Sequence, residues 1–196
     1  MGITDFVIHE HKQAWPYDIG VSFTKTIFWN VIDHCIEMNG VSRVKSMNFR
    51  RAEIRDFLAI AALDRQAWGK NRYSTYIPDG EHAWRLWVEH AHVFCAQNDQ
   101  GEIMGAILAF PCVQAMSCVH KVFVDGRVRR QGIGSALFEM LLKELDRETA
   151  SSFLTVAPEN SAAIKLYEKW GFRDKELVRG YYRSNEDRYV MTRSPQ

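Results

Sequence analysis

From Phe49 onward, apolar positions follow by turns the two-residue period of strands and the period of about 3.6 residues that marks helices, with short loops between the segments. The first helical segment begins near Asp56, a residue type suited to capping a helix. The second follows the loop at residues 78–80. Each segment carries one apolar stripe, formed by Phe57, Ile60, Leu63 and Ala67 in the first and by Trp84, Trp87, Val88 and Ala91 in the second.

One strand is expected before these two helices, and the chain after them predicts six further strands and two further helices. The segments 93–97 and 102–110 flank a good hairpin turn, so they should pair antiparallel. More strands are expected at 118–124, 153–156, 172–182 and 188–192. One helix has the buried stripe Ile133, Leu137, Met140, Leu141 and Leu145. The other helix runs over 160–170, and Gly171 can end it in a left-handed conformation. This order predicts an α/β (α+β) fold in which helices cover a mixed sheet.

Residues 1–46 stand apart from this pattern as an N-terminal extension. They contain one predicted amphipathic helix, whose apolar positions are Ile27, Phe28, Val31, Ile32, Cys35 and Ile36. Such a helix needs a surface to cover, which favours packing on the main domain or in a homodimer over a targeting role. A dimerisation element, a lid and a misassigned start all stay open, because Met47 opens a segment that itself looks like a start.

Composition restricts the function classes. A chain of 196 residues with 46% hydrophobic residues fits one soluble domain, here 47–196 after the extension. A formal net charge of +1 argues against a nucleic-acid partner. The N-terminus lacks a signal-peptide pattern and no apolar run is long enough to span a bilayer, so we expect a cytoplasmic protein with no membrane partner. The cysteines and histidines lack metal-ligand spacing, so free thiols and no metal are expected.

Positive charge is concentrated where a predicted strand gives way to a helix. The stretch RVRRQGIGSAL holds Arg127, Arg129 and Arg130 beside Gly132 and Gly134. A helix N-terminus leaves backbone N–H groups without partners and carries a partial positive charge, so this turn is suited to bind phosphate. A P-loop is excluded because Gly-Lys does not occur here, and a dinucleotide fingerprint is excluded by the leucine three residues after the second glycine.

The pattern Arg-x-x-Gly-x-Gly resembles that of the GNAT superfamily of N-acetyltransferases. Three segments carry the resemblance in the right order, VFVDGRVRRQGIGSALF, LTVAPENSAAIKLYEKWGF and GYYRSNEDRYVMT, within about residues 47–193. The resemblance implies the GNAT fold: a mixed, mostly antiparallel sheet of six to seven strands, splayed between strands 4 and 5 and flanked by about four helices.

The resemblance also implies acetyl-CoA (coenzyme A) as the cofactor. Its pyrophosphate would lie on the turn, and its pantetheine arm would bond to the backbone of the preceding strand and to Asn160. Plain core roles for Val122 and Val124 are equally compatible with the sequence. The implied cofactor-binding residues are Val122, Phe123, Val124, Arg129, Arg130, Gln131, Gly132, Ile133, Gly134, Ser135 and Asn160.

Tyr167 follows Asn160 by seven residues, about two helical turns, and as in the family it would lie near the sulfur as general acid. A core aromatic role is the alternative. Glutamates that serve as bases in two branches of the family would fall at Thr155 and Cys118, so no carboxylate occupies either position. His120, two residues from Val122 and predicted on the same strand face, is the available catalytic base; a histidine without catalytic duty or a water chain to a distant carboxylate are alternatives.

These inferences predict an N-acetyltransferase that moves an acetyl group from acetyl-CoA to a primary amine of a small molecule, peptide or protein. The amine would attack directly in a ternary complex. The alternative is a non-catalytic sensor or regulatory module that binds acyl-CoA on the same fold. Aromatic side chains offer walls for the acceptor or simple packing, namely Trp68, Tyr73, Tyr76, Trp84, Tyr181 and Tyr182.

Overall fold

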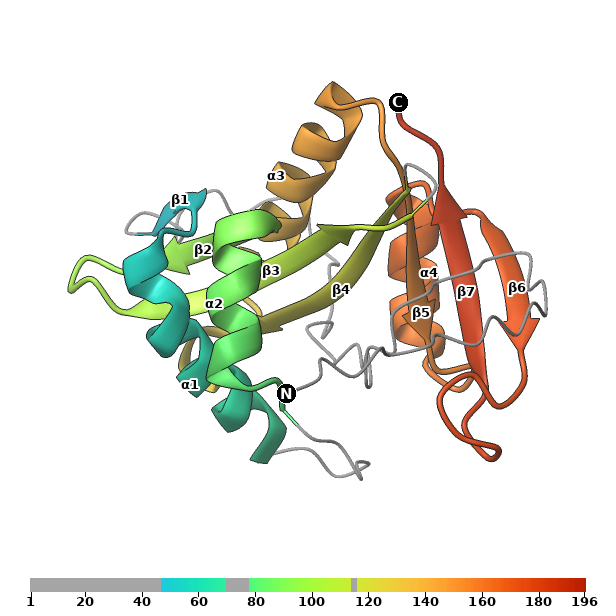
Figure 1. The fold of residues 1–196 in the computed structure, drawn as a ribbon, viewed down its shortest axis with the longest axis horizontal. Coiled ribbons are helices and arrows are strands. Elements are labelled where there is room, and N and C mark those ends of the chain that lie inside the picture. The colour runs from blue at the N-terminus through green and yellow to red at the C-terminus, as the bar shows by residue number, and fades with distance from the viewer. Residues whose placement is uncertain (1–46, 70–77, 114–115) are drawn as a thin grey trace, which may run out of the picture.

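The computed structural model describes residues 47–69, 78–113 and 116–196, which form one seven-stranded sheet with helices on both faces (Figure 1). The strand order is β1-β2-β3-β4-β5-β7-β6. The strands are β1 (Asn48–Arg51), β2 (His92–Gln97), β3 (Ile103–Pro111), β4 (Met116–Val124), β5 (Ser151–Val156), β6 (Asp174–Val178) and β7 (Arg188–Arg193). The helices are α1 (Phe57–Gly69), α2 (Glu81–His90), α3 (Ile133–Arg147) and α4 (Ser161–Lys169), with short 3-10 turns η1 (Ile54–Asp56) and η2 (Gly126–Val128).

This order of elements confirms the predicted fold class, and the predicted hairpin between β2 and β3 pairs antiparallel. Every pairing in the sheet is antiparallel except that of β4 with β5. Gly171 has a φ of +92° after α4, as predicted for a helix end. The prediction for Asp56 was wrong in detail. Its carboxylate accepts the Glu53 backbone N–H at 2.7 Å, so it caps the start of η1 and not α1.

The predicted helix within residues 1–46, the tyrosines Tyr73 and Tyr76, and the side chain of Trp68 lie outside the described residues. The described cysteines are Cys95, Cys112 and Cys118, and all three are free thiols.

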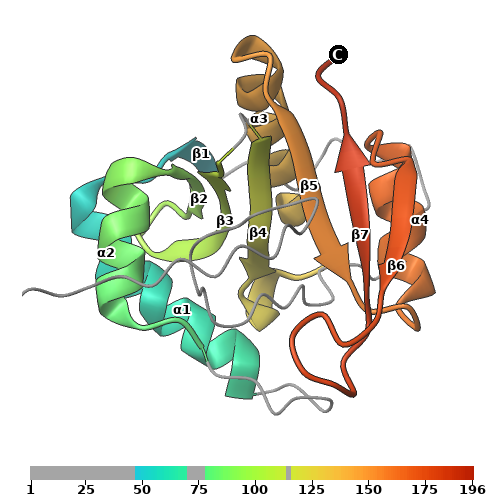
Figure 2. The same cartoon turned by 45° about the vertical axis from the view of Figure 1, so that its right-hand side comes forward.

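The sheet separates two buried clusters. On one face, α3 and α4 cover an apolar cluster that includes Val122 and Val124 of β4, Ile133 of α3 and Tyr167 of α4. On the other face, α1 and α2 cover a second cluster that includes Trp84 and Phe123. The views of Figures 1 and 2 show these two helix pairs on opposite sides of the sheet. Alternation along β2 and β3 sends successive side chains to opposite clusters.

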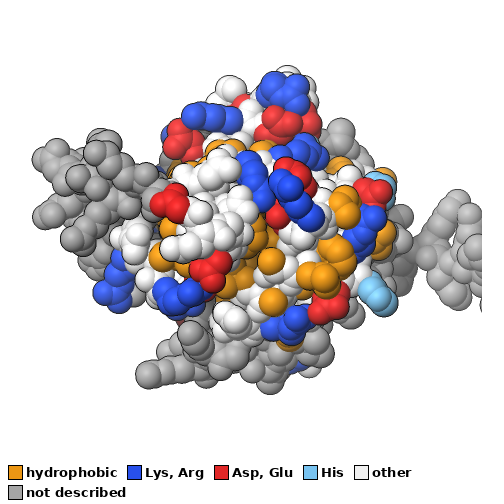
Figure 3. Space-filling view, turned by 90° about the vertical axis from the view of Figure 1, so that its left-hand side faces the viewer, with side chains coloured by type: hydrophobic (Ala, Val, Ile, Leu, Met, Phe, Trp, Pro, Cys, Tyr) orange, Lys and Arg blue, Asp and Glu red, His pale blue; other side chains and the backbone are white. Residues whose placement is uncertain are grey.

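Close packing of α3 on the sheet depends on Gly105 in β3. A Cβ atom at this position would lie 3.0 Å from the Phe123 carbonyl oxygen and 3.3 Å from Leu137 of α3. Figure 3 shows the side of the molecule at the left of Figure 1, where β1 and the β2–β3 turn lie, and hydrophobic and charged side chains are interspersed there. Ile54, Leu58 and Leu86 are exposed on η1, α1 and α2.

Candidate active site

The sheet opens between its two parallel strands. β4 and β5 pair only at Met116 with Ser151, Ser117 with Ser152 and Cys118 with Phe153. Beyond Cys118, β4 stays paired with β3 through Val124, whereas β5 runs on along β7. The two strands therefore diverge in the direction of the chain, as Figure 2 shows. This confirms the predicted splay, and it leaves the 119–124 edge of β4 without a sheet partner on the β5 side.

The turn after β4 is built to expose backbone. Asp125 accepts the Arg127 backbone N–H at 2.8 Å and also binds the Arg127 guanidinium, so that arginine is already paired. Arg130 has a φ of +62° and Gly132 a φ of +79°, both in the left-handed region. A Cβ atom on Gly132 would meet nothing within 4 Å. The turn therefore leaves open space directly at the N-terminus of α3.

Exposed positive charge flanks this open space. Arg129 and Arg130 are exposed, while Ile133 and Gly134 are buried at the start of α3. The first N–H groups of a helix point out along its axis and its dipole is positive there, so an anion is favoured at this position. The structure thus brings together the arginines, Gln131, both glycines and the N-terminus of α3, as the sequence predicted.

Asn160 and Tyr167 lie at the two ends of α4. Asn160 is the N-cap of this helix, and its side-chain oxygen accepts the Ala163 backbone N–H at 3.1 Å. Tyr167 is 2% exposed and contacts Phe138 and Phe172 in the α3/α4 cluster. Burial raises the pKa of the Tyr167 hydroxyl well above its ordinary value, so it holds its proton throughout the neutral range. Tyr167 is therefore both a packed core aromatic and a protonated hydroxyl.

His120 lies on the opposite face from Val122, and the predicted shared face was wrong. The register between β3 and β4 slips by one residue, from Leu108 with Lys121 to Ala109 with Val119. His120 is the extra residue of this β-bulge, which breaks the two-residue alternation. Val122 belongs to the α3/α4 cluster, whereas the His120 ring contacts Trp87 of α2, with ring centroids 5.2 Å apart.

Around His120, four side chains form what we call the buried charge cluster: Asp64, Asp79, His120 and Lys121. Lys121 is 1% exposed, and its Nζ lies 3.0 Å from Asp64 Oδ2 and also contacts Asp79 Oδ2. His120 Nε2 lies 3.5 Å from the same oxygen of Asp79. Burial lowers the pKa of His120, and the neighbouring Lys121 lowers it further, against the opposing effect of Asp79. The imidazole is therefore neutral at pH 7.

The loop between β6 and β7 reaches this same face of the sheet. Asp187 accepts the Gly180 backbone N–H at 2.9 Å and closes the loop that carries Tyr181 and Tyr182. The Tyr182 hydroxyl lies 3.0 Å from Thr155 Oγ1 on β5. Burial, with the thiols of Cys118 and Cys112 nearby, raises the pKa of Tyr181 to about 12.

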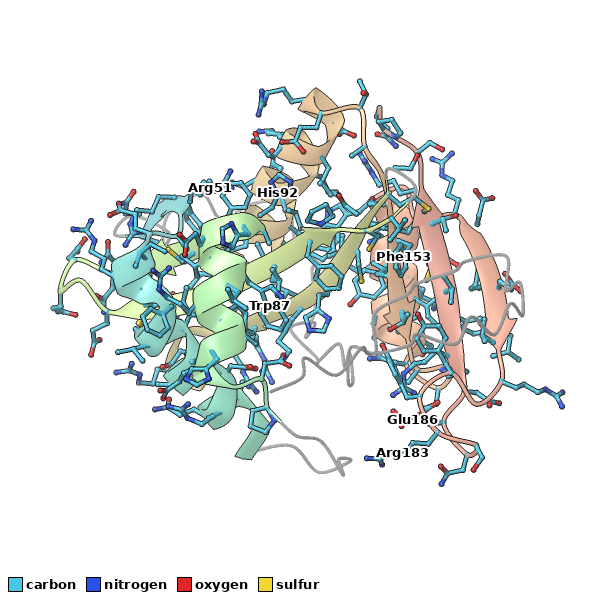
Figure 4. The ribbon with its side chains drawn as sticks, in the orientation of Figure 1. Arg51, Trp87, His92, Phe153, Arg183 and Glu186 are labelled. Carbon is cyan, nitrogen blue, oxygen red and sulfur yellow. The ribbon has the colours of Figure 1, made fainter. Side chains whose placement is uncertain are left out.

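Tyr182 contacts Thr155, and Tyr181 lies near Cys118, so the two tyrosines lie beside the two positions at which the family resemblance would place glutamates. Burial raises the pKa of the Cys118 thiol, so it is neutral and cannot serve as a base. In Figure 4, Trp87 and Phe153 lie on the viewer's side of the sheet, and Arg183 and Glu186 lie in the β6–β7 loop below β5.

Comparison with known proteins identifies this arrangement. The sequence profile described as the Acetyltransferase (GNAT) family matches residues 57–172, more than half of the chain. The chain belongs to the GNAT family. An N-alpha-acetyltransferase of Sulfurisphaera tokodaii is 29% identical over 174 residues, which cover 80% of this chain and 98% of that relative.

Two findings from Escherichia coli extend the comparison. A [ribosomal protein bS18]-alanine N-acetyltransferase is 38% identical over 88 residues, 43% of this chain and 60% of that relative. The crystal structure of the ribosomal-protein-S18-alanine N-acetyltransferase superposes with a TM-score of 0.64 and 25% identity, over 76% of this chain and 94% of that one. The protein is accordingly a GNAT acyltransferase, and acetyl-CoA is the cofactor of its family.

The described residues of this GNAT chain fit acetyl-CoA. The open space at Gly132 leaves room for an anion on the backbone. The freed edge of β4 offers N–H and C=O groups to an extended arm, because its register with β5 stops at Cys118. The turn residues, with Asn160 at the start of α4, would hold the cofactor, and the thioester would then lie where the two strands part.

Sequence reasoning missed Asp64, Asp79 and Lys121. The sequence held a signal for two of these residues, Asp64 and Lys121. Asp64 stands four residues after Ile60 and three before Ala67, so it lies on the predicted apolar stripe of its helix. Lys121 interrupts the apolar strand VHKVFV. A charged residue at a position that the pattern assigns to the core requires a buried partner.

A second group of polar side chains in the described residues lies away from this site. His92, Glu144 and Glu148 have metal-ligand chemistry and lie within 4.8 Å of one another. Contacts within the protein account for the group, because Arg147 forms an ion pair with Glu144 at 2.7 Å and His92 Nε2 lies 3.1 Å from a carboxylate oxygen of Glu148. It stands at the opposite end of α3 from Gly132, about 22 Å away. None of the helices that the structure describes is long and apolar enough to cross a membrane.

Proposed function

We propose that this GNAT enzyme transfers the acetyl group of acetyl-CoA to the α-amino group of a peptide or protein, by direct attack in a ternary complex. One observation carries the proposal: the pairing of β4 and β5 ends at Cys118, between an anion-ready turn on one face and His120 on the other. Acetyl-CoA supplies an acetyl group in a thioester, whose carbonyl carbon accepts an amine and whose thiolate leaves.

The class of acceptor amine is inferred from how easily the amine loses its proton. An amine must be neutral to attack, which at pH 7 costs about 1.4 kcal/mol for an α-amino group of pKa near 8 and about 4.6 kcal/mol for a lysine. The pKa of His120 is lowered by burial, so this histidine is a weak base. A weak base suits the easier of the two deprotonations. The names of the relatives, N-alpha-acetyltransferase and ribosomal-protein-alanine N-acetyltransferase, support the same class.

Each protein group has one role in this proposal. Tyr167 holds a proton that it can donate to a leaving thiolate, because burial keeps its hydroxyl neutral. Backbone N–H groups of residues 122–124 can donate to the oxygen that gains charge. His120 accepts a proton from the amine. Tyr181 and Tyr182 form a wall of the acceptor site through the β6–β7 loop.

A second candidate function is a sensor that binds acyl-CoA without turnover. The observation in its favour is that neither of the two glutamate positions holds a base. Cys118 is a neutral thiol, and the Thr155 hydroxyl is hydrogen-bonded to Tyr182. The cofactor site is the same in both candidates. Turnover alone separates them.

The test uses the full chain, acetyl-CoA and two matched peptides analysed by mass spectrometry. One peptide has a free N-terminal alanine and no lysine, and the other has a blocked N-terminus and one lysine. The proposal expects acetylation of the first peptide and little of the second. Acetyl-CoA binding without acetylation of either peptide favours the sensor, and acetylation of the lysine peptide alone contradicts the assigned acceptor class.

A further inference from the structure

The buried charge cluster lies on the acceptor side of β4 and none of its carboxylates has yet been given a role. Resting on the proposed function, we infer that Asp79 is a positioning residue for His120, held in place by Lys121 and Asp64. The imidazole then takes the proton of the amine beside a fixed carboxylate. As the amine nitrogen bonds to the acetyl carbon and the carbon–sulfur bond breaks, one proton passes from the amine to His120.

The contacts form a continuous chain from the core to the histidine. The indole Nε1–H of Trp84 donates to Asp64 Oδ2 at 3.0 Å, and the Asp79 backbone N–H donates to the same oxygen at 3.3 Å. Lys121 joins the two carboxylates. Each link fixes the next, so Asp79 Oδ2 is held 3.5 Å from His120 Nε2.

Burial shows where the cluster opens. The side chains of Asp64 and Lys121 are 0% and 1% exposed and that of His120 is 5% exposed, whereas that of Asp79 is 13% exposed. Among these four described side chains, that of Asp79 is the most exposed, so the cluster meets solvent mainly at this carboxylate. A carboxylate at this opening attracts a cationic amine before it loses its proton.

Charge balance within the described residues points the same way. Two carboxylates and one ammonium group leave one net negative charge while the imidazole is neutral, and protonation of His120 brings the cluster to neutrality. Burial of the imidazole lowers the pKa of His120, and the carboxylates of Asp79 and Asp64 oppose that effect, so they offset part of the cost of protonating His120. Among the described residues, the groups seen to face His120 are Asp64 from α1, Asp79 from the segment before α2, Lys121 from β4, and the uncharged rings of Trp87 from α2 and Phe110 from β3.

Two substitutions should move the pKa of His120 in opposite directions. Asp79→Asn removes the carboxylate that raises the pKa of His120, so this pKa falls. Lys121→Met removes the ammonium group that lowers it, so the pKa rises. Asp79→Asn leaves Lys121 paired with Asp64, so it is expected to fold and decides the test if Lys121→Met does not.

Two readouts are needed on the full chain. The first is the NMR titration of the His120 ring, assigned with His120→Gln, which requires no turnover. The second is the pH profile of kcat/KM for an α-amino peptide, whose acidic limb reports the base. Glu89→Gln on α2 is the matched control, because it removes the same charge from an exposed carboxylate.

The inference expects both the titration and the acidic limb to move to lower pH in Asp79→Asn and to stay in place in Glu89→Gln. A His120 titration that does not move in Asp79→Asn overturns it, and so does one that moves while the activity limb stays. If the wild-type chain acetylates no peptide but still binds acetyl-CoA, the proposed function fails. In that case Asp79 has no catalytic role to support, even if the His120 titration moves in Asp79→Asn.

Discussion

The two faces of the central sheet differ in what they bury. The α3/α4 face buries apolar side chains, and its chemistry is concentrated at helix ends: the turn before α3 and the cap of α4. The α1/α2 face buries two carboxylates, an ammonium group and an imidazole, while leucines lie exposed on its outer surface. In the proposed mechanism the α3/α4 face holds the cofactor with backbone groups and contributes the Tyr167 hydroxyl, and the α1/α2 face acts on the amine with side chains. The parting of β4 and β5 is the place where both can reach the same substrate.

The largest effect is expected from closing the turn on the α3/α4 face. Gly132→Glu places a negative side chain in the open space at the start of α3, so acetyl-CoA should bind more weakly by over about 100-fold, or about 2.8 kcal/mol. Calorimetric titration measures this.

Gly101→Glu is the matched control for that titration. Gly101 also has a positive φ, +83°, but lies in the β2–β3 turn, so the same backbone strain should leave binding unchanged. Equal loss of affinity in both variants would mean that strain, and not the turn, controls binding.

The next largest effect concerns the proton donor on the same face. Tyr167→Phe keeps the ring packed on Phe138 and Phe172 and removes only the hydroxyl. We expect kcat to fall by about 100-fold, with the dissociation constant for acetyl-CoA unchanged. Steady-state kinetics beside calorimetry separates the two quantities. Activity within a factor of two of the wild type would reduce Tyr167 to a core aromatic.

A smaller effect distinguishes the two roles of Asn160. Asn160→Ala removes the cap of α4 and should cost about 1 kcal/mol of unfolding free energy, whereas Asn160→Asp keeps an acceptor oxygen for the Ala163 N–H and should cost less. Urea unfolding measures both. If the two variants bind acetyl-CoA with the wild-type affinity, Asn160 is a cap alone.

A comparably small effect tests the wall on the α1/α2 face. Tyr182→Phe and Thr155→Val each break the same 3.0 Å hydrogen bond, at a cost of about 0.5–1.5 kcal/mol in stability. The double variant should cost no more than the larger single one, and KM for the peptide should rise while KM for acetyl-CoA stays constant. Additive costs would show that the two hydroxyls act independently.

Most of the α3/α4 face could be predicted from the sequence, because its features are local. The turn residues 129–135 are contiguous, and Asn160 and Tyr167 share one short helix. A glycine spacing and a helix cap are set by a few neighbouring residues, so the pattern is sufficient to find them.

The α1/α2 face could not be predicted in the same way. Asp64 and Lys121 are 57 residues apart and meet only in the folded chain. The bulge at His120 depends on the register of β4 against β3, which no local pattern encodes, so the alternation rule placed its ring on the wrong face.

The most direct test of the two-face account is an NMR experiment on the wild-type chain with each ligand in turn. Coenzyme A should shift the methyl signals of Ile133 and Ile164 in the α3/α4 cluster, and an alanine-terminated peptide should shift the Trp87 indole and the His120 ring signals. The account would be contradicted if both ligands shifted only one of the two sets of signals. It would also be contradicted if coenzyme A shifted the indole signal and the peptide shifted the isoleucine signals.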